Sequence, residues 1–232
     1  MLDRTDLVSQ LKDASLLTDK AFVGGEWTGA EGGRSFPVIN PARGDTLVSV
    51  PDLGEAEISR AIDIAHDAQK DWARKTGKER AAVLWRWYEL MTANADDLAA
   101  ILTAEMGKPI AKAKGEIFYG ASFIEWYAEE AKRVYGETIP GHHPDRRLIV
   151  IKQPIGVAAS ITPWNFPNAM IARKVAPALA AGCAMVARPA SETPLSALAM
   201  AVLAERAGVP KGVFSVVTST SSSEVGKLFC SH

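Results

Sequence analysis

The sequence places an amide side chain, Asn165, between two aromatic residues in the segment Ile-Thr-Pro-Trp-Asn-Phe-Pro, residues 161–167. Two prolines restrict the backbone of this segment, and Trp164 and Phe166 can hold the amide in one position. A fixed amide N–H in a dry site stabilises negative charge that develops on an oxygen, with a contribution of about 3–4 kcal/mol for one donor. The alternative is a strand-to-helix turn whose asparagine satisfies only backbone groups. The segment by itself leaves both interpretations open.

A second polar segment, Ala-Arg-Pro-Ala-Ser-Glu-Thr-Pro, occupies residues 187–194, between a predicted strand and a predicted helix. Its Arg188 and Ser191 offer a cation and a hydroxyl at the carboxyl end of the strand, where such groups can bind ribose hydroxyls or a phosphate. The alternative is an ordinary capped helix start with a surface arginine. The G-x-G-x-x-G fingerprint of many dinucleotide sites is absent from the sequence.

The elements around these two segments alternate between strand and helix. The sequence predicts strands at 157–161, 184–187 and 213–217, and helices at 168–181, at 194–207 and from Ser222 onward. Alternation with short links indicates an α/β fold with a Rossmann-like parallel sheet and flanking helices. Such sheets bind ligands beyond the carboxyl ends of their strands, and both polar segments follow strand ends. With only three alternating strands, we expect the front part of a longer protein.

Residues typical of helix caps indicate where these helices begin and end. Thr193 is predicted to cap the helix that follows it, Gly208 suits the helix exit, and Ser221 with Glu224 has the spacing of a capping box. A serine-rich stretch, Ser-Thr-Ser-Ser-Ser-Glu-Val-Gly at residues 219–226, includes that box.

The first 140 residues have a different character. Short β-prone runs with Gly, Pro and Asn between them predict hairpins at 22–51. Helical periodicity follows, with predicted helices at 55–72, 79–94, 96–106 and 112–135. In the last helix one buried stripe is expected, and the aromatics on that helix are interpreted as core. The stripe is Ile117, Ala121, Ile124, Ala128, Ala131 and Tyr135, and the aromatics are Phe118, Phe123, Trp126 and Tyr127.

Composition excludes several classes of function. The 232 residues include 47% hydrophobic and 23% charged residues, which is typical of a globular protein. A formal net charge of −1 provides no basic field for nucleic acid or anionic lipid. No apolar run approaches the roughly 18 residues of a membrane helix, and the first residues lack the pattern of a secretory signal or a mitochondrial presequence. We therefore expect a cytoplasmic protein with no nucleic-acid or membrane partner.

Cysteine and histidine usage argues against disulfides and metal. Cys183 and Cys230 are the two cysteines, too few for a disulfide framework. The adjacent His142 and His143 lie in a Gly- and Pro-bounded turn without a cysteine or carboxylate at ligand spacing, so no metal site is predicted.

Several stretches, in order, resemble the aldehyde dehydrogenase superfamily. They include Pro-Trp-Asn-Phe-Pro at 163–167, Ala-Ala-Gly-Cys-Ala-Met-Val-Ala-Arg-Pro at 180–189 and residues 25–51. Residues 123–139, 145–158 and 164–183 are similar to the branch that acts on succinate semialdehyde. The resemblance covers nearly the whole chain after about residue 20. It implies oxidation of an aldehyde with NADP⁺ or NAD⁺, through attack by a cysteine thiolate and release of the acid by a glutamate-activated water.

The resemblance assigns roles to individual residues. Asn165 matches the oxyanion-hole asparagine of the family. Ser191 stands where a glutamate would repel a 2′-phosphate, which favours NADP⁺ over NAD⁺, and Glu192 next to it argues the other way. Two segments match the cofactor-lining positions: Ile161, Thr162, Pro163 and Trp164, and then Arg188, Pro189, Ala190 and Ser191.

Substrate contacts are implied for Arg173 and Phe166. Arg173 matches an arginine that pairs with the distal carboxylate of a small semialdehyde, most often succinate semialdehyde. Glutarate semialdehyde is the alternative substrate. A surface arginine on an amphipathic helix is the alternative interpretation of Arg173.

The resemblance places the nucleophilic cysteine and the general base beyond residue 232. Cys183 is expected to be an inert core thiol and Cys230 matches no catalytic motif. Besides oxidation of succinate semialdehyde or of glutarate semialdehyde, a third function remains open for the chain, namely nucleotide binding without catalysis. Three parts are expected: an amino-terminal arm and helical part at 1–140, a bridging hairpin at 141–156 and an incomplete NAD(P)-binding part at 157–232. Family members form homo-oligomers, and the hairpin resembles their bridging element.

Overall fold

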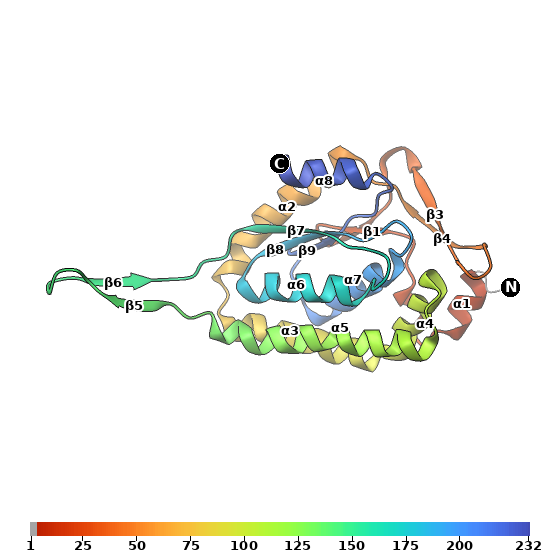
Figure 1. Cartoon of the computed structure of the whole chain (residues 1–232). Helices are drawn as coiled ribbons and strands as arrows, with labels where there is room; N and C mark the ends of the chain where they lie inside the picture. Colours follow the sequence, from red (N-terminus) through yellow and green to blue (C-terminus); the bar gives the residue numbers. More distant parts are fainter. Residues whose placement is uncertain (1–3) are drawn as a thin grey trace.

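The computed structural model describes the backbone of residues 4–232 and the side chains of residues 7–232. Its centre is a five-stranded sheet with the order β2-β1-β9-β8-β7 (Figure 1). The strands of this sheet are β1 (Ala21–Val23), β2 (Glu26–Thr28), β7 (Val157–Ile161), β8 (Ala184–Arg188) and β9 (Phe214–Val216).

The parallel part of the sheet agrees with the sequence prediction. Strands β7, β8 and β9 run parallel and are joined through α6 (Ala169–Ala181) and α7 (Leu195–Ala207). All five residues of β8 are buried, as expected for a strand covered on both faces. Gly182 and Gly208 end the two helices in the left-handed conformation, which confirms the predicted exit at Gly208.

The sheet is mixed rather than purely parallel. Strand β1 pairs antiparallel with β9 through Phe22 and Val216, and β2 pairs antiparallel with β1. The hairpin β1–β2 turns at Gly24 and Gly25, both at positive φ. The sequence predicted this hairpin without predicting that it extends the sheet. It covers the edge of β9, so the sheet has two strands more than the three alternating ones that the sequence predicted.

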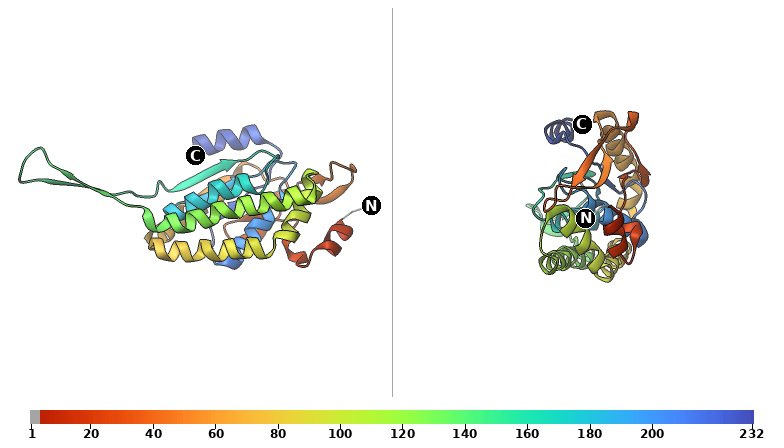
Figure 2. Two further views of the ribbon diagram at one scale, coloured as in Figure 1. Left: turned by 60° about the horizontal axis from the view of Figure 1, so that its bottom comes forward. Right: turned by 90° about the vertical axis from the view of Figure 1, so that its right-hand side faces the viewer.

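Helices cover both faces of the sheet (Figures 1 and 2). Helices α6 and α7 pack on one face, and α2 (Glu55–Arg74) and α8 (Ser222–Ser231) on the other. Helices α3 (Gly77–Ala93) and α5 (Ile110–Glu130) form an outer layer over α6 and α7, and α4 (Ala95–Met106) packs against α5 and α7. At the amino-terminal end lie α1 (Arg4–Gln10) and the hairpin of β3 (Ser35–Ile39) and β4 (Thr46–Pro51).

Helix α5 departs from the prediction at its end and in its aromatics. It ends at Glu130 and continues as a short 3-10 turn, so the 3.6-residue period does not reach Tyr135, which is 65% exposed. The other members of the predicted stripe are buried. Phe118 and Trp126 are exposed, because they lie on the face of α5 turned away from the core, and the core interpretation is wrong for both.

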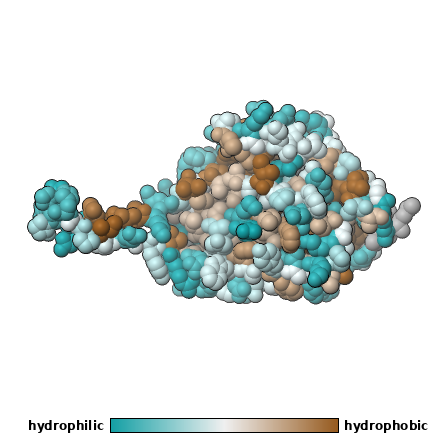
Figure 3. Space-filling model, viewed as in Figure 1, coloured by the Kyte–Doolittle hydropathy of each residue, from teal (hydrophilic) through white to brown (hydrophobic). Residues whose placement is uncertain are grey.

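A third hairpin projects from the body (Figure 1). Strands β5 (Glu137–Pro140) and β6 (Arg147–Val150) pair antiparallel, and every residue of both strands is exposed. Apolar surface gathers on this hairpin next to the body (Figure 3). Its exposed apolar residues include Ile139, Leu148, Ile149 and Val150. The sequence placed a bridging hairpin at 141–156, which includes β6, whereas β5 precedes those bounds.

Candidate active site

The two predicted polar segments meet at the carboxyl edge of the parallel strands. Ile161, the last residue of β7, is in register with Arg188, the last residue of β8. The backbone N–H of Thr162 donates to the carbonyl of Arg188 at 3.1 Å, and that of Val217 donates to Ala187 at 2.9 Å. The loops after β7, β8 and β9 therefore start side by side, as the alternation of strands and helices predicted.

Buried polar atoms without a partner gather at this edge. Within the described residues, seven such side-chain atoms belong to this region: Ser160 Oγ, Thr162 Oγ1, Asn168 Nδ2 and Oδ1, Arg188 Nε, Thr193 Oγ1 and Ser196 Oγ. Buried polar groups in native proteins are paired with protein, water or ligand. The edge therefore fits a polar ligand such as the nucleotide predicted for it.

Asn165 is exposed in the middle of the loop between β7 and α6. Its backbone carbonyl accepts a hydrogen bond from Lys108 Nζ at 3.1 Å, and its carboxamide makes no hydrogen bond within the described chain. Trp164 and Phe166 are exposed as well. The expectation that these aromatics enclose the amide in a dry site is therefore wrong for the described residues, which leave the amide open to a ligand.

Arg188 joins two strand ends. Its side chain is buried and donates to the carbonyl of Ser219 at 2.7 Å, which ties the end of β8 to the loop between β9 and α8. Burial lowers the pKa of Arg188, an effect that Glu192 and Asp52 oppose. The buried Nε has no hydrogen-bond partner, and Nη2 is engaged by Ser219, so any contact with a ribose involves a guanidinium that is already held.

Ser191 lies in the loop after β8, beside the buried Pro189 and Ala190. Its hydroxyl donates to Glu192 at 3.1 Å. The two residues line a hollow together with Glu105, Thr220 and residues of β3. No acidic residue stands at the position of Ser191 itself, and Glu192 is exposed next to it.

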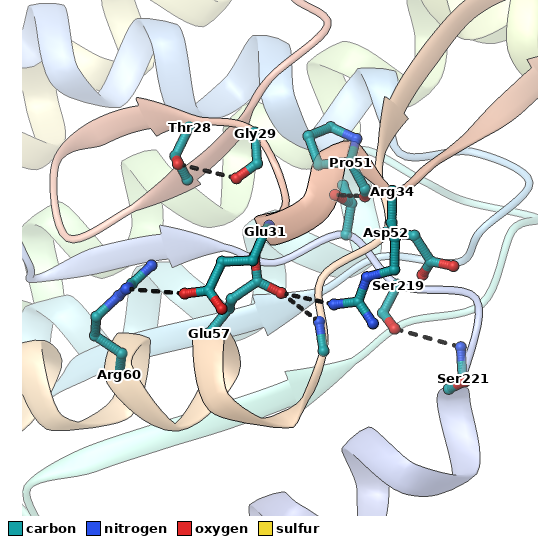
Figure 4. A network of polar contacts seen from close by, with 12 residues as sticks. Thr28, Gly29, Glu31, Arg34, Pro51, Asp52, Glu57, Arg60, Ser219 and Ser221 are labelled. Carbon is teal, nitrogen blue, oxygen red and sulfur yellow. Dashed lines mark hydrogen bonds and ion pairs between the residues drawn. The ribbon is translucent and has the colours of Figure 1, made fainter.

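The loop between β9 and α8 is anchored on its far side by β4 and α2. The backbone N–H and the hydroxyl of Thr220 donate to Asp52 at 2.8 and 2.9 Å, and Leu53 N donates to the carbonyl of Thr218 at 2.9 Å. Neighbouring Glu57 is buried and accepts from Arg34 and from two backbone N–H groups (Figure 4). The cavity there measures about 110 Å³, too small for a dinucleotide.

The predicted capping box of α8 does not form. Ser221 is the N-cap residue, but its side chain makes no capping hydrogen bond. Its backbone N–H instead donates to Ser219 Oγ at 3.3 Å, because the serine-rich loop satisfies its own polar groups (Figure 4).

Two buried glutamates that sequence reasoning missed cap the helices of the site. Glu105 of α4 accepts from the N–H groups of Leu195 and Ser196 at 2.7 and 2.8 Å and so caps α7. It replaces the predicted cap Thr193, whose hydroxyl is buried without a partner. Glu116 of α5 accepts from Asn168 and Ala169 and so caps α6. The sequence signal that could have indicated these caps is a glutamate at a helix position whose neighbours on the same face are apolar.

Arg173 lies on the exposed face of α6, two turns beyond Asn165. Its guanidinium is 5.5 Å from the centre of the Phe123 ring, and it lies 4.0 Å from the sulfur of Met170. Within the described residues it forms no ion pair with a carboxylate. The cation is therefore available to an anion that reaches this face.

The cysteines differ in accessibility. Cys183 is buried between α6 and β8, and Cys230 is exposed near the end of α8. Within the described residues no group of three or more His, Cys, Asp or Glu side chains could hold a metal ion. In the same part of the chain, no helix has the length and apolar character needed to cross a membrane.

Comparison with known proteins identifies the family. The pattern of the aldehyde dehydrogenase family matches residues 27–232. The chain belongs to the aldehyde dehydrogenase family. The resemblance found in the sequence and the expected α/β fold are both confirmed. A crystal structure of succinate-semialdehyde dehydrogenase from Burkholderia pseudomallei superimposes with a TM-score of 0.94 and 58% identity, over 96% of this chain and 46% of that chain.

Curated relatives differ in the substrates that their names give. The chain is 61% identical to 3-sulfolactaldehyde dehydrogenase of Pseudomonas putida, over 96% of this chain and 46% of the relative. It is 63% identical to glutarate-semialdehyde dehydrogenase of Pseudomonas aeruginosa, over 94% and 45%. For the NADP(+) succinate-semialdehyde dehydrogenase of Escherichia coli the identity is 60%, over 91% and 44%. The chain thus spans less than half the length of these relatives, and identity does not separate the three substrates.

The buried carboxyl of Glu105 generates a prediction on stability. Burial raises its pKa from 4.5 to about 8 in the folded protein, despite the hydrogen bonds from Ser196 and Leu195, which lower it. Between these two pH values the folded state binds more protons than the unfolded state, so the free energy of unfolding falls as pH rises. Urea unfolding from pH 5 to pH 8 should show this decline, and Glu105→Gln should reduce it. Equal pH dependence in both proteins would contradict the assignment.

Proposed function

We propose that this chain forms the cofactor-binding and oxyanion-stabilising part of an NAD(P)-dependent dehydrogenase for a small aldehyde with a distal anionic group. The observation that carries the proposal is the unpartnered carboxamide of Asn165 at the end of β7, beside the orphaned polar atoms at the ends of β7 and β8. When bound, the cofactor supplies the hydride acceptor. Asn165 donates its side-chain N–H to the aldehyde oxygen as negative charge develops there.

The residues around Asn165 would form one wall for the cofactor. Those on the β7 side are Ile161, Thr162, Pro163 and Trp164, and those on the β8 side are Arg188, Pro189, Ala190 and Ser191. The unpartnered donors among them, Thr162 Oγ1 and Arg188 Nε, support this assignment. They would bind and orient the cofactor and take no part in proton transfer.

We favour NADP⁺ over NAD⁺ as the cofactor. Ser191 presents a hydroxyl where a carboxylate would repel a 2′-phosphate, and the guanidinium of Arg188 lies at the end of the adjoining strand. The Escherichia coli relative is named for NADP(+). The carboxylate of Glu192 works against the phosphate, and it accepts a hydrogen bond from the hydroxyl of Ser191.

The substrate class follows from Arg173. The three relatives are named for 3-sulfolactaldehyde, glutarate semialdehyde and succinate semialdehyde, each an aldehyde that carries a sulfonate or a carboxylate. A guanidinium pairs with either anion through two parallel hydrogen bonds. We propose succinate semialdehyde as the substrate, with succinate as the product, glutarate semialdehyde as the alternative and Phe166 as an apolar contact.

The described cysteines do not supply the nucleophile in this proposal. A thiolate must be exposed to the substrate and stabilised by its surroundings, and Cys183 is buried whereas Cys230 lies near the end of α8. This observation favours a second candidate function for the isolated 232-residue chain, namely nucleotide binding without turnover. We also propose that the apolar hairpin β5–β6 mediates self-association.

The first test concerns Asn165. In a polypeptide that also carries the catalytic thiol, Asn165→Ala should lower kcat for succinate semialdehyde by about 100-fold to 1,000-fold, because one oxyanion donor is lost. The rate is followed by the near-ultraviolet absorbance of NADPH. Gln153→Ala, which removes an exposed amide before β7, is the control and should retain full activity. An Asn165→Ala variant within a factor of two of wild type would refute the oxyanion role.

A second test concerns cofactor choice and uses the 232-residue chain. Ser191→Glu should weaken NADP⁺ binding by about tenfold or more relative to NAD⁺, since repulsion between two charges at about 4 Å costs 1–4 kcal/mol. Titration calorimetry measures both dissociation constants. Ser122→Glu, the same change at an exposed position on α5, should leave their ratio unaltered. Failure of the wild-type chain to bind either nucleotide would contradict the cofactor assignment.

The third test concerns the distal anion. In a polypeptide that also carries the catalytic thiol, Arg173→Gln should raise KM for succinate semialdehyde by about tenfold to a hundredfold, because a charge-assisted hydrogen bond contributes about 1.5–3 kcal/mol. KM for butanal, which lacks the carboxylate, should stay the same. Arg146→Gln on the projecting hairpin is the matched control. A parallel rise of KM for both aldehydes would instead indicate general damage to the site.

A further inference from the structure

The junction between α4 and α5 supports the loop that carries Asn165. We propose that Lys108 and Glu116 are positioning residues for Asn165, which hold the backbone on both sides of its carboxamide and leave the carboxamide open. The inference rests on the proposed role of Asn165 as the oxyanion donor. Its structural part, the clamp itself, can be tested without turnover.

Lys108 contacts the loop at two neighbouring residues. Its Nζ donates to the backbone carbonyl of Asn165 at 3.1 Å and lies 4.0 Å from the centre of the Phe166 ring, within range of a cation–π interaction. The side chain is only 13% exposed. Lys108 follows Gly107, which ends α4 in the left-handed conformation, and precedes Pro109, the N-cap of α5. The lysine therefore projects from a well-defined turn.

Glu116 closes the same clamp from α5. One carboxylate oxygen forms an ion pair with Lys108, and the other accepts from the N–H groups of Asn168 at 3.0 Å and Ala169 at 3.3 Å. Its side chain is 1% exposed. A buried carboxylate is costly unless it is paired and hydrogen-bonded, and here both oxygens have partners. The pair thus spans the loop from Asn165 to the first turn of α6.

Close packing makes the clamp rigid. Gly120, one turn after Glu116, lies against Asn168: a Cβ atom at Gly120 would stand 2.3 Å from Asn168 Oδ1 and 3.3 Å from the Cα of Ala169. Helix α5 can therefore approach the start of α6 only with glycine at this position. The close approach brings Glu116 within hydrogen-bonding distance of the α6 backbone.

The division of contacts points to positioning rather than to anchoring alone. Glu116 by itself would satisfy the first turn of α6, whereas Lys108 adds contacts to the carbonyl of Asn165 and the ring of Phe166. Within the described residues no group of the clamp bonds to the Asn165 carboxamide. An oxyanion donor must be fixed before the charge develops and must have its N–H free, and the clamp meets both conditions.

Selective ¹⁵N labelling of asparagine tests the clamp in the 232-residue chain, which contains four asparagines, Asn40, Asn94, Asn165 and Asn168. In Lys108→Met the backbone and side-chain signals of Asn165 and Asn168 should shift, while those of Asn94 stay in place. Lys108→Arg retains a cation with N–H donors and should restore the signals towards wild type. Lys112→Met, an equal loss of charge at an exposed position on α5, should change none of them.

Unshifted Asn165 and Asn168 signals in Lys108→Met would overturn the proposal, as would equal shifts in Lys112→Met.

Amide hydrogen exchange gives a second measurement. Glu116→Gln should accelerate exchange at Asn168 and Ala169 by about tenfold or more, the loss of one charge-assisted hydrogen bond. If Lys108→Met does not fold, amide hydrogen exchange in the wild-type chain tests the clamp. The amides of Asn168 and Ala169 should then exchange more slowly than the first-turn amides of α8, because α8 has no side-chain cap. Equal exchange rates would overturn the clamp. A clamp that passes these tests, with Asn165→Ala fully active, would refute the proposed function and not the clamp.

Discussion

The buried carboxylates of Glu105 and Glu116 determine where the two loops of the candidate site lie. Each accepts two backbone N–H groups at the start of a helix that follows a parallel strand. Helix starts leave N–H groups without partners and carry partial positive charge, so a carboxylate there offsets part of the cost of its own burial. The outer helices α4 and α5 thereby fix the positions of the first turns of α6 and α7 relative to the sheet. The loops after β7 and β8 lead into these turns, so their positions are fixed as well.

The two capping glutamates differ in how their charge is compensated. Glu116 is paired with Lys108, so its charge is compensated within the core. Glu105 accepts from the N–H groups of Leu195 and Ser196 and forms no ion pair within the described residues, and burial raises its pKa. The cap of α6 is thus part of an ion pair, whereas the cap of α7 depends on the protonation of one carboxyl. The ion-paired cap is the one that lies beside the loop of Asn165.

Most of the fold could be predicted from local patterns. The apolar period located α2 to α7 to within a few residues, and the alternation of strands and helices located β7, β8 and β9. Periodicity failed where the backbone changed geometry, as at Tyr135 beyond the end of α5. Local patterns indicated the hairpin of β1 and β2 but not its place in the sheet, which β1 joins through the register pair of Phe22 with Val216 on β9. Pairing between segments so far apart in sequence leaves no local trace.

The candidate site was predictable in its residue types and not in its supports. The motifs gave Asn165, Arg188 and Ser191, and the structure brings their loops to one edge of the sheet. Glu105 and Glu116 were missed because periodicity ranks helix positions by apolar character, and Lys108 was missed because it lies in the turn between α4 and α5. A glutamate among apolar helix positions lowers the predicted burial of that helix face. In this fold, however, each of the two glutamates supplies the hydrogen-bond acceptor for the start of a neighbouring helix. Thr193 and Ser221 were assigned as caps on spacing alone, and neither side chain makes a capping bond.

The two arginines of the site show why residue type alone does not assign a role. Arg188 is buried and already donates to Ser219, so its charge chiefly holds two strand ends together. Arg173 is exposed, packs beside the Phe123 ring and has no carboxylate partner within the described residues. An exposed guanidinium without a carboxylate partner can pair with an incoming anion through charge-assisted hydrogen bonds. We therefore propose that Arg173, rather than Arg188, recognises the distal sulfonate or carboxylate of the substrate, with the Phe123 ring beside its guanidinium.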